Sequence, residues 1–240
     1  MIFQTTVAIV AVIAGAVASL AGFGIGSLLT PLLMVQTSIG IAVAGMAIAH
    51  FFGTALRFFL LRRFLNRKVL FSFGLTSAAG GLIGALLHNI FQNVVLTIIF
   101  GCLLVFAGIM GLTGLSDRLR LKGPVVWLAG GISGLFGGLV GNQGGIRSAA
   151  LLGFNLDKDQ FVATATGIAL MVDTARVPVY LAVQRAQIAS IWQFILVATI
   201  GVIIGTVGGK KILEKMPEYI FKKTVASIIL LIGILVLIER

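Results

Sequence analysis

The chain has 240 residues, of which 59% are hydrophobic and only 10% charged, and its mean hydropathy is +1.13. A soluble domain carries about 25% charged residues, and several apolar runs here reach the roughly 20 residues that cross a bilayer, so a soluble fold is excluded. The formal net charge is +11, but the bases cluster at the ends of apolar runs, as topology signals do, which argues against a nucleic-acid partner. The composition predicts an all-α polytopic membrane protein surrounded by lipid.

The first half of the chain, residues 1–115, predicts a broken helical hairpin followed by three membrane-spanning helices. An apolar run at 2–20 leads through AGFGIG into a short helix at 27–36. Glycine lets the backbone turn or approach another segment closely, and Pro31 suits the first turn of a helix. The three long apolar segments that follow cover residues 38–61, 69–87 and 94–115.

A basic connector at 116–123 leads into the second half, 124–240, in which the pattern recurs. An apolar run at 124–136 meets the glycine-rich break GLVGNQGG, and a short helix follows at 146–154. The long apolar segments of this half cover residues 161–182, 188–208 and 219–238. We therefore predict one integral membrane domain built from two homologous halves.

Leucine, isoleucine and glycine residues recur in the same order in both halves. Leu20, Gly22 and Gly26 correspond to Leu135, Gly137 and Gly141, and Gly80, Ile83 and Gly84 correspond to Gly201, Ile204 and Gly205. Interrupted helices at corresponding positions of two halves are the best pointer in a sequence to the binding site of a transporter.

The Lys and Arg residues distinguish two topologies. If each broken segment crosses the bilayer, several lysines beyond residue 157 would face the outside. If each is a re-entrant hairpin that enters and leaves on one side, only Arg185 and Arg240 lie outside, which fits the positive-inside rule far better. We therefore expect six full spans, two hairpins and inverted halves, in a multi-pass protein of the inner (plasma) membrane.

The second glycine break is followed directly by Arg147, an ionisable residue at membrane depth and hence a candidate functional residue. Helix N-termini near 27 and near 145–146 would point free N–H groups and positive dipole ends into one space, where an anion binds well. Guanidinium adds a planar fork that matches oxyanions. The candidate substrate contacts are Asn142, Gln143, Gly144, Gly145, Arg147, Ser148 and Arg176, with Gly24, Gly26, Ser27 and, one turn further, Thr30. The alternative is that the glycines pack helices and Arg147 extends to an interface.

Three further ionisable positions are candidates for coupling or gating. Asp173 is spaced i, i+3 from Arg176, so the two can neutralise each other; alternatively Arg176 contacts substrate while Asp173 orients it or accepts a coupling proton. Arg57 lies near the basic loop RRFLNRK, and we interpret it mainly as a residue that extends to the membrane surface. His50 has no His, Cys or carboxylate nearby in sequence, which leaves a packing role or a proton relay.

Enzyme motifs are lacking. The sequence has no metal-ligand spacing and no GxxxxGK[ST] motif, and Cys102 is its single cysteine. We therefore expect neither an enzyme nor a bound cofactor.

Two segments, AGFGIGSLLTPLL and the stretch from GNQGGIRSAALL to VDTARVPVYL, resemble the TauE/SafE family of sulfite and organosulfur anion exporters. The resemblance covers essentially the whole chain, and QGGIRSAALL followed by VDTARVPVYL is its more specific part. It implies secondary export of small sulfur-containing anions such as sulfite, sulfoacetate or related sulfonates.

Our first hypothesis is a secondary transporter that binds a small anion near the membrane midplane, between the two broken-helix motifs, and works by alternating access. One alternative is an anion channel lined by the same residues, and another is a membrane subunit of a larger complex. Which anion is carried, in which direction, with proton coupling or without it, and whether the chain forms a homo-oligomer stay open at this point.

Overall fold

Helices make up the regular structure of the computed structural model, which describes residues 2–91, 93–115, 123–151, 154, 156–213 and 218–238. The elements are α1 (Ile2–Ala21), α2 (Ile25–Met34), α3 (Ile39–Leu61), the short 3-10 helix η1 (Arg62–Phe64), α4 (Arg67–His88), α5 (Asn93–Thr113), α6 (Val125–Val140), α7 (Gly144–Leu151), α8 (Lys158–Val183), α9 (Arg185–Ser190), α10 (Trp192–Leu213) and α11 (Glu218–Ile238).

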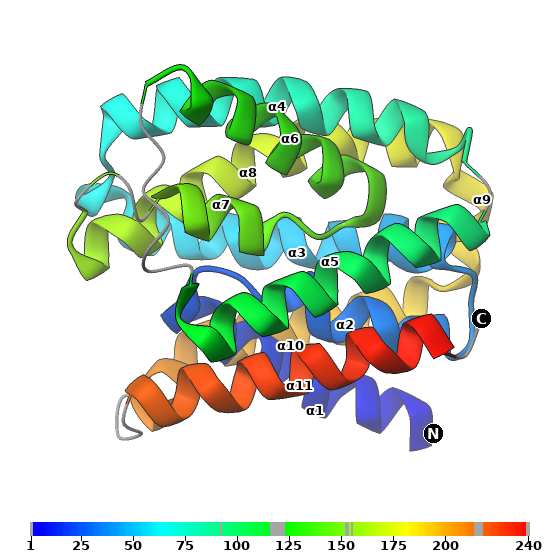
Figure 1. The fold of residues 1–240 in the computed structure, drawn as a ribbon. Coiled ribbons are helices and arrows are strands. Elements are labelled where there is room, and N and C mark those ends of the chain that lie inside the picture. The colour runs from blue at the N-terminus through cyan, green and yellow to red at the C-terminus, as the bar shows by residue number, and fades with distance from the viewer. Residues whose placement is uncertain are drawn as a thin grey trace.

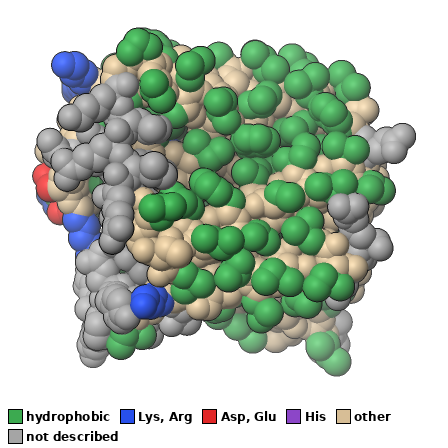
Figure 2. Space-filling view, in the orientation of Figure 1, with side chains coloured by type: hydrophobic (Ala, Val, Ile, Leu, Met, Phe, Trp, Pro, Cys, Tyr) green, Lys and Arg blue, Asp and Glu red, His purple; other side chains and the backbone are tan. Residues whose placement is uncertain are grey.

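Among the described helices, five are long and apolar enough to cross a membrane: α1, α3 continued by η1, α4, α5 and α8. α10 and α11 are apolar over the shorter stretches Trp192–Gly208 and Ala226–Ile238. Large apolar side chains such as Phe59 and Leu128 are exposed, and Figure 2 shows hydrophobic side chains spread over the described part of the visible face, with charged groups toward one side of it. An apolar surface of this extent suits lipid. The prediction of an all-α polytopic membrane protein is confirmed.

Each half contains a broken hairpin and then three longer helices, as predicted, with the short α9 between α8 and α10. The halves interlock, because the first helix of each hairpin packs on a long helix of the other half: α1 on α10, and α6 on α4 (Figure 1). Across the centre, α3 packs on α8 and α5 on α11. The contact of α1 with α10 thus corresponds to that of α6 with α4, and the other two contacts each join corresponding helices of the two halves. Repeats related by a two-fold axis make contacts of this kind. The inverted orientation of the halves in the bilayer stays a prediction.

Glycines bring the interlocked helices into backbone contact. A Cβ added to Gly134 of α6 would lie 1.9 Å from the Ser77 carbonyl oxygen of α4. A Cβ added to Gly205 of α10 would lie 1.9 Å from the Val12 carbonyl oxygen of α1. Small residues permit this close approach of helices in membranes. The glycines that revealed the repeat in the sequence therefore include those that join the two halves.

The helix ends differ from the sequence prediction around both breaks. α6 continues through Gly137 to Val140, so the second break is shorter than GLVGNQGG, because glycine is tolerated inside a helix that packs closely on its neighbour. α2 begins at Ile25, two residues earlier than predicted. Pro31 consequently lies inside this helix and not in its first turn.

A contact between two loops bears on the topology. The backbone N–H of Asn66, directly before α4, donates to Thr164 Oγ1 near the start of α8 at 3.1 Å. The basic loop RRFLNRK therefore lies at the same end of the molecule as Lys158. A topology with eight crossings would place these bases on opposite sides, whereas re-entrant hairpins place them together, so the contact favours the hairpins. The number of spans stays a prediction.

Candidate functional site

The two chain breaks contact each other. Gly22 (φ +77°) and Gly24 (φ +126°) form the first break, and Gly141 (φ +73°) begins the second; all three lie in the backbone region that favours glycine. A Cβ added to Gly26 would lie 2.6 Å from the Gly141 carbonyl oxygen, and one added to Gly144 would lie 2.6 Å from Phe23 Cβ. The breaks thus meet backbone to backbone, as predicted.

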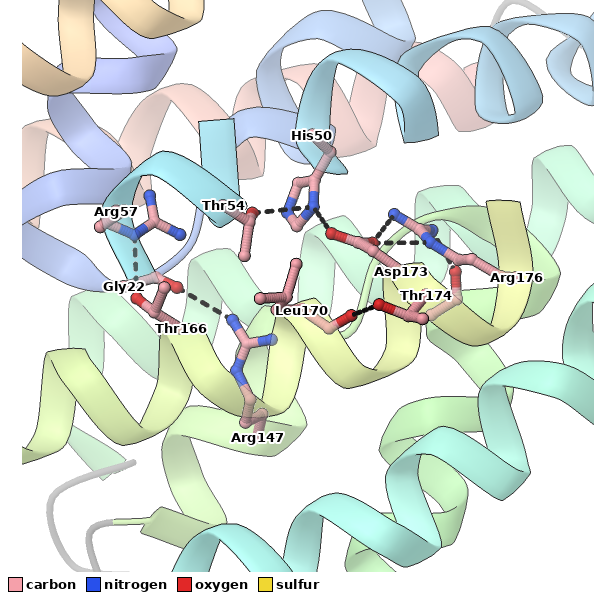
Figure 3. Close-up of polar contacts among 11 residues, drawn as sticks. Gly22, His50, Thr54, Arg57, Arg147, Thr166, Leu170, Asp173, Thr174 and Arg176 are labelled. Atoms are coloured by element: carbon pink, nitrogen blue, oxygen red, sulfur yellow. Dashed lines mark hydrogen bonds and ion pairs between the residues drawn. The ribbon is translucent and has the colours of Figure 1, made fainter. Parts of the chain in front are cut away.

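Arg147 of α7 extends from the second hairpin to the first break. Its side chain is 1% exposed, and its Nη2 donates to the Gly22 carbonyl oxygen at 2.9 Å (Figure 3). Its Nε and Nη1 are buried and have no hydrogen-bond partner among the described residues. The alternative in which Arg147 extends to an interface is wrong, because the side chain turns into the protein between the two hairpins.

Neutral polar groups of the second break and of α7 are buried and lack partners in the described part of the chain. They are Asn142 Nδ2, both side-chain polar atoms of Gln143, and Ser148 Oγ. Leaving such groups without hydrogen bonds costs roughly 1–3 kcal/mol each, so a bound polar ligand would stabilise them. On α2, Ser27 and Thr30 are also buried.

Two predicted glycines do not face the opposite break. The Cβ direction of Gly24 points at Val17 of α1, 2.9 Å from its Cγ1, and that of Gly145 points at Ala107 of α5, 3.2 Å from its Cβ. Gly24 and Gly145 therefore pack against neighbouring helices, whereas Gly26 and Gly144 pack against the opposite hairpin.

Asp173 lies at the centre of a buried cluster between α3 and α8. Its Oδ1 accepts from Arg176 Nε at 2.9 Å and lies 2.8 Å from Arg176 Nη2, so the pairing expected from the i, i+3 spacing is present. Its Oδ2 lies 2.6 Å from His50 Nδ1, and Thr54 Oγ1 lies 3.2 Å from the same nitrogen. His50 therefore has a carboxylate partner that its local sequence does not reveal.

Side chains from α8 and α4 cap the end of α6. The last carbonyls of a helix have no partner inside the helix. Arg176 Nη1 donates to the Gly137 carbonyl oxygen at 2.5 Å, and the Tyr180 hydroxyl donates to that of Gly138. His88 Nδ1 lies 2.6 Å from the Leu139 carbonyl oxygen. Sequence reasoning missed Tyr180 and His88, although Tyr180 is one turn beyond Arg176 on the same face of the helix.

Arg57 is the clearest correction to the sequence interpretation. Its side chain is 2% exposed and does not extend to the membrane surface; its Nε donates to Thr166 Oγ1 of α8 at 2.9 Å. His50, Thr54 and Arg57 share one face of α3 by their spacing, and that face packs on α8.

The family model described as sulfite exporter TauE/SafE matches residues 7–236. The chain belongs to the TauE/SafE family. Comparison with curated proteins and with solved structures gives no match. TauE/SafE is a family of membrane transporters, and the resemblance drawn from the sequence motifs is confirmed.

The structure places the two most specific motifs of this TauE/SafE chain on adjoining helices. QGGIRSAALL begins with the last residue of the second break and continues as α7, which carries Arg147. VDTARVPVYL lies on α8 and carries Asp173, Arg176 and Tyr180. Of the described residues, no group of three or more His, Cys, Asp or Glu side chains is placed to hold a metal ion. Around the second break the structure instead has a buried guanidinium and buried neutral donors without partners among the described residues, which are groups of the kind that bind anions.

Proposed function

We propose that this membrane protein is a secondary transporter that exports small sulfur-containing anions, such as sulfite or organosulfonates, and binds them where the two broken hairpins meet. The observation that carries the proposal is Arg147: a buried guanidinium, beside two interrupted helices, with Nε and Nη1 lacking partners among the described residues. Membership of the TauE/SafE family supports both the transport role and the class of anion.

The neighbouring groups fit an oxyanion in chemistry as well as in charge. The amide of Asn142 and the hydroxyl of Ser148 are further buried donors without partners in the described chain. A bound oxyanion would accept from several of these donors at once and would offset the buried charge of Arg147. A cation would meet no buried carboxylate here besides Asp173, which Arg176 and His50 already contact in the described structure.

The way the halves interlock supports an alternating-access mechanism. Each hairpin packs on a long helix of the other half, so α1 with α10 and α4 with α6 form two glycine-packed units. Movement of one unit against the other would open the junction of the breaks to one side and then to the other. A bound anion that contacts both hairpins would therefore affect the relative position of the two units.

Proton coupling is a separate hypothesis, motivated by the contact between His50 and Asp173. Asp173 is the one buried carboxylate among the described residues, and His50 is an ordinary proton acceptor. Anion export from proteoliposomes that rises with an imposed pH gradient would support coupling. Identical rates with and without that gradient would reject it.

The test of the binding site uses Arg147→Ala in purified protein. We expect wild-type protein to be stabilised by about 2.7 kcal/mol when sulfite exceeds its dissociation constant about a hundredfold, and to exchange labelled sulfite across proteoliposomes. Arg147→Ala should lose both responses and still be recovered folded from the membrane. Arg67→Ala is the matched control, since Arg67 is exposed, and it should behave as wild type.

The outcomes separate the proposal from its alternatives. Normal transport by Arg147→Ala contradicts the assignment of the site. Flux at ion-channel rates without counterflow of labelled anion indicates a channel lined by the same residues. Wild-type protein that transports nothing in liposomes indicates a membrane subunit that needs a partner.

A further inference from the structure

The buried charges of the described chain do not balance. Arg57, Arg147, Arg176 and Asp173 are its buried charged side chains. Asp173 directs Oδ1 to Arg176 and Oδ2 to His50, and neither Arg57 nor Arg147 lies within ion-pair distance of it. Arg57 and Arg147 therefore have no acidic partner among the described residues. With His50 neutral, this cluster has an excess of two positive charges.

The two arginines without acidic partners converge from different halves of the chain. Figure 3 shows Arg57 reaching from α3 and Arg147 from α7 toward the space around Gly22 and Thr166. One nitrogen of each is anchored: Arg57 Nε on Thr166 Oγ1, and Arg147 Nη2 on the Gly22 carbonyl oxygen, both at 2.9 Å. Arg57 Nη1 and Arg147 Nε and Nη1 are buried and lack partners in the described chain.

Such an arrangement is unfavourable without a ligand. A buried charge without an acidic partner is costly because little water is present to solvate it, and here two such charges lie around the same chain break. The anchoring hydrogen bonds fix the direction of each guanidinium but supply only neutral acceptors. A pair of oriented, buried arginines with free donors has the features of a site prepared for an anion with more than one charge.

We propose that Arg57 and Arg147 together bind one doubly charged oxyanion, so that the anion bridges the two halves of the protein. The proposal rests on the proposed transport function and specifies its substrate as divalent. A dianion offsets the charges of both arginines, whereas a monovalent anion of the same shape leaves one buried charge uncompensated. Each half contributes one arginine, so the bound dianion holds the halves together and couples its binding to their relative movement.

The experiment compares two anions of different charge in four purified proteins. Sulfate is the divalent probe and methanesulfonate the monovalent one, because the latter keeps three sulfur-bound oxygens and replaces the fourth with a methyl group. In wild-type protein we expect sulfate to bind about tenfold more tightly or better, the difference that one additional charge-assisted hydrogen-bonding partner supplies. The variants are Arg57→Gln, Arg57→Lys and the exposed control Arg67→Gln.

Arg57→Gln should lower the affinity for sulfate to that for methanesulfonate. The affinity for methanesulfonate should itself change less than about threefold, since Arg147 still offsets the single charge of that anion. Arg57→Lys keeps the charge and should keep part of the preference for sulfate. Arg67→Gln should keep all of it. Removal of a buried charge without an acidic partner should leave Arg57→Gln at least as stable as wild type in the absence of anions.

Two results would overturn the inference. One is wild-type protein that binds both anions with equal affinity, and this comparison holds even if Arg57→Gln fails to fold. The other is an Arg57→Gln variant that folds and keeps the full preference for sulfate. Both leave the proposed transport function intact, whereas a wild-type protein that binds neither these anions nor sulfite contradicts the proposed function itself.

Discussion

The two broken hairpins have the same backbone design and different chemistry. α1–α2 and α6–α7 are each interrupted at a glycine with positive φ, Gly22 at +77° and Gly141 at +73°. Gly22 therefore corresponds to Gly141 in the structure and not to Gly137, with which the sequence comparison paired it. Each continues into a short helix, and each packs its first helix backbone to backbone on a long helix of the other half. Yet residues 2–34 contain no charged side chain, whereas the second break is followed by Arg147 and its α6 carbonyls are capped by α8 side chains.

This difference indicates that the repeat supplies the scaffold and one half supplies most of the chemistry. The first hairpin contributes a carbonyl, that of Gly22, and the second contributes the arginine that donates to it. The two-fold arrangement therefore holds one asymmetric site in place of two equivalent ones. The ion pair of Asp173 and Arg176 should respond to changes in the second half, whereas anion binding should also respond to changes at Arg57 of the first half. Changes to the scaffold should act equally in both halves.

The largest effect should come from Asp173→Asn, which tests the chemistry that only the second half carries. The change keeps the size of the side chain but leaves Arg176 buried without its anionic partner. Breaking a buried ion pair in this way costs about 3–5 kcal/mol. Thermal and denaturant unfolding of the purified protein would measure the loss.

The control for this change is Asp159→Asn, also on α8 but exposed. Its effect should stay within about 0.5 kcal/mol. Equal stabilities of the two variants would mean that the Asp173 cluster does not stabilise the junction of the two hairpins. The difference in chemistry between the hairpins would then have no effect on stability.

Gly134→Ala in α6 and Gly205→Ala in α10 should destabilise the scaffold equally, because each disturbs one of the two contacts by which the halves interlock. At both positions the new Cβ would lie 1.9 Å from a backbone carbonyl oxygen of the helix it packs on. Overpacking of this kind costs about 1–3 kcal/mol, and backbone cannot move aside as a side chain can. Thermal unfolding would show two losses of similar size.

Gly131→Ala is the matched control for these glycines, because a Cβ there meets nothing within 4 Å. Alanine favours a helix over glycine by about 1 kcal/mol, so this variant should be as stable as wild type or slightly more so. A large loss from Gly134→Ala with none from Gly205→Ala would show that the two interlocking contacts are not equivalent.

Local patterns in the sequence predicted the parts of this protein that depend on neighbouring residues. Apolar run lengths gave the helical membrane class, the ordered glycines gave the repeated hairpins, and the i, i+3 spacing gave the pair of Asp173 and Arg176. The end of α6 was misplaced because Gly137 and Gly138 look like a break in the sequence, whereas the packing of Gly138 on the backbone of α4 accompanies a helix that continues to Val140.

Contacts that depend on how distant helices cross could not be predicted in the same way. His50 meets Asp173, and Arg57 meets Thr166, only because α3 and α8 cross face to face. Neither helix carries a sequence signal for its partner. The side chain of Arg57 points inward because of that crossing. Its position next to a basic loop in the sequence suggested a surface role instead.

The smallest effect should come from Tyr180→Phe, which tests whether the two breaks respond differently to the loss of one hydrogen bond. The change removes only the hydroxyl that donates to the Gly138 carbonyl oxygen, whereas at the first break the Gly22 carbonyl oxygen, directly after α1, accepts from Arg147, which the change leaves in place. The loss of one such hydrogen bond costs about 1 kcal/mol, and faster hydrogen exchange should appear at the second break and not at the first. Thr174→Val is the control, since its hydroxyl donates within α8 to Leu170 and is exposed. If backbone amides at both breaks exchanged faster in Tyr180→Phe, the hydrogen bonds to the α6 carbonyls would be shown to stabilise the whole junction. The first hairpin, which has no charged side chain, would then also depend on the second hairpin for its stability.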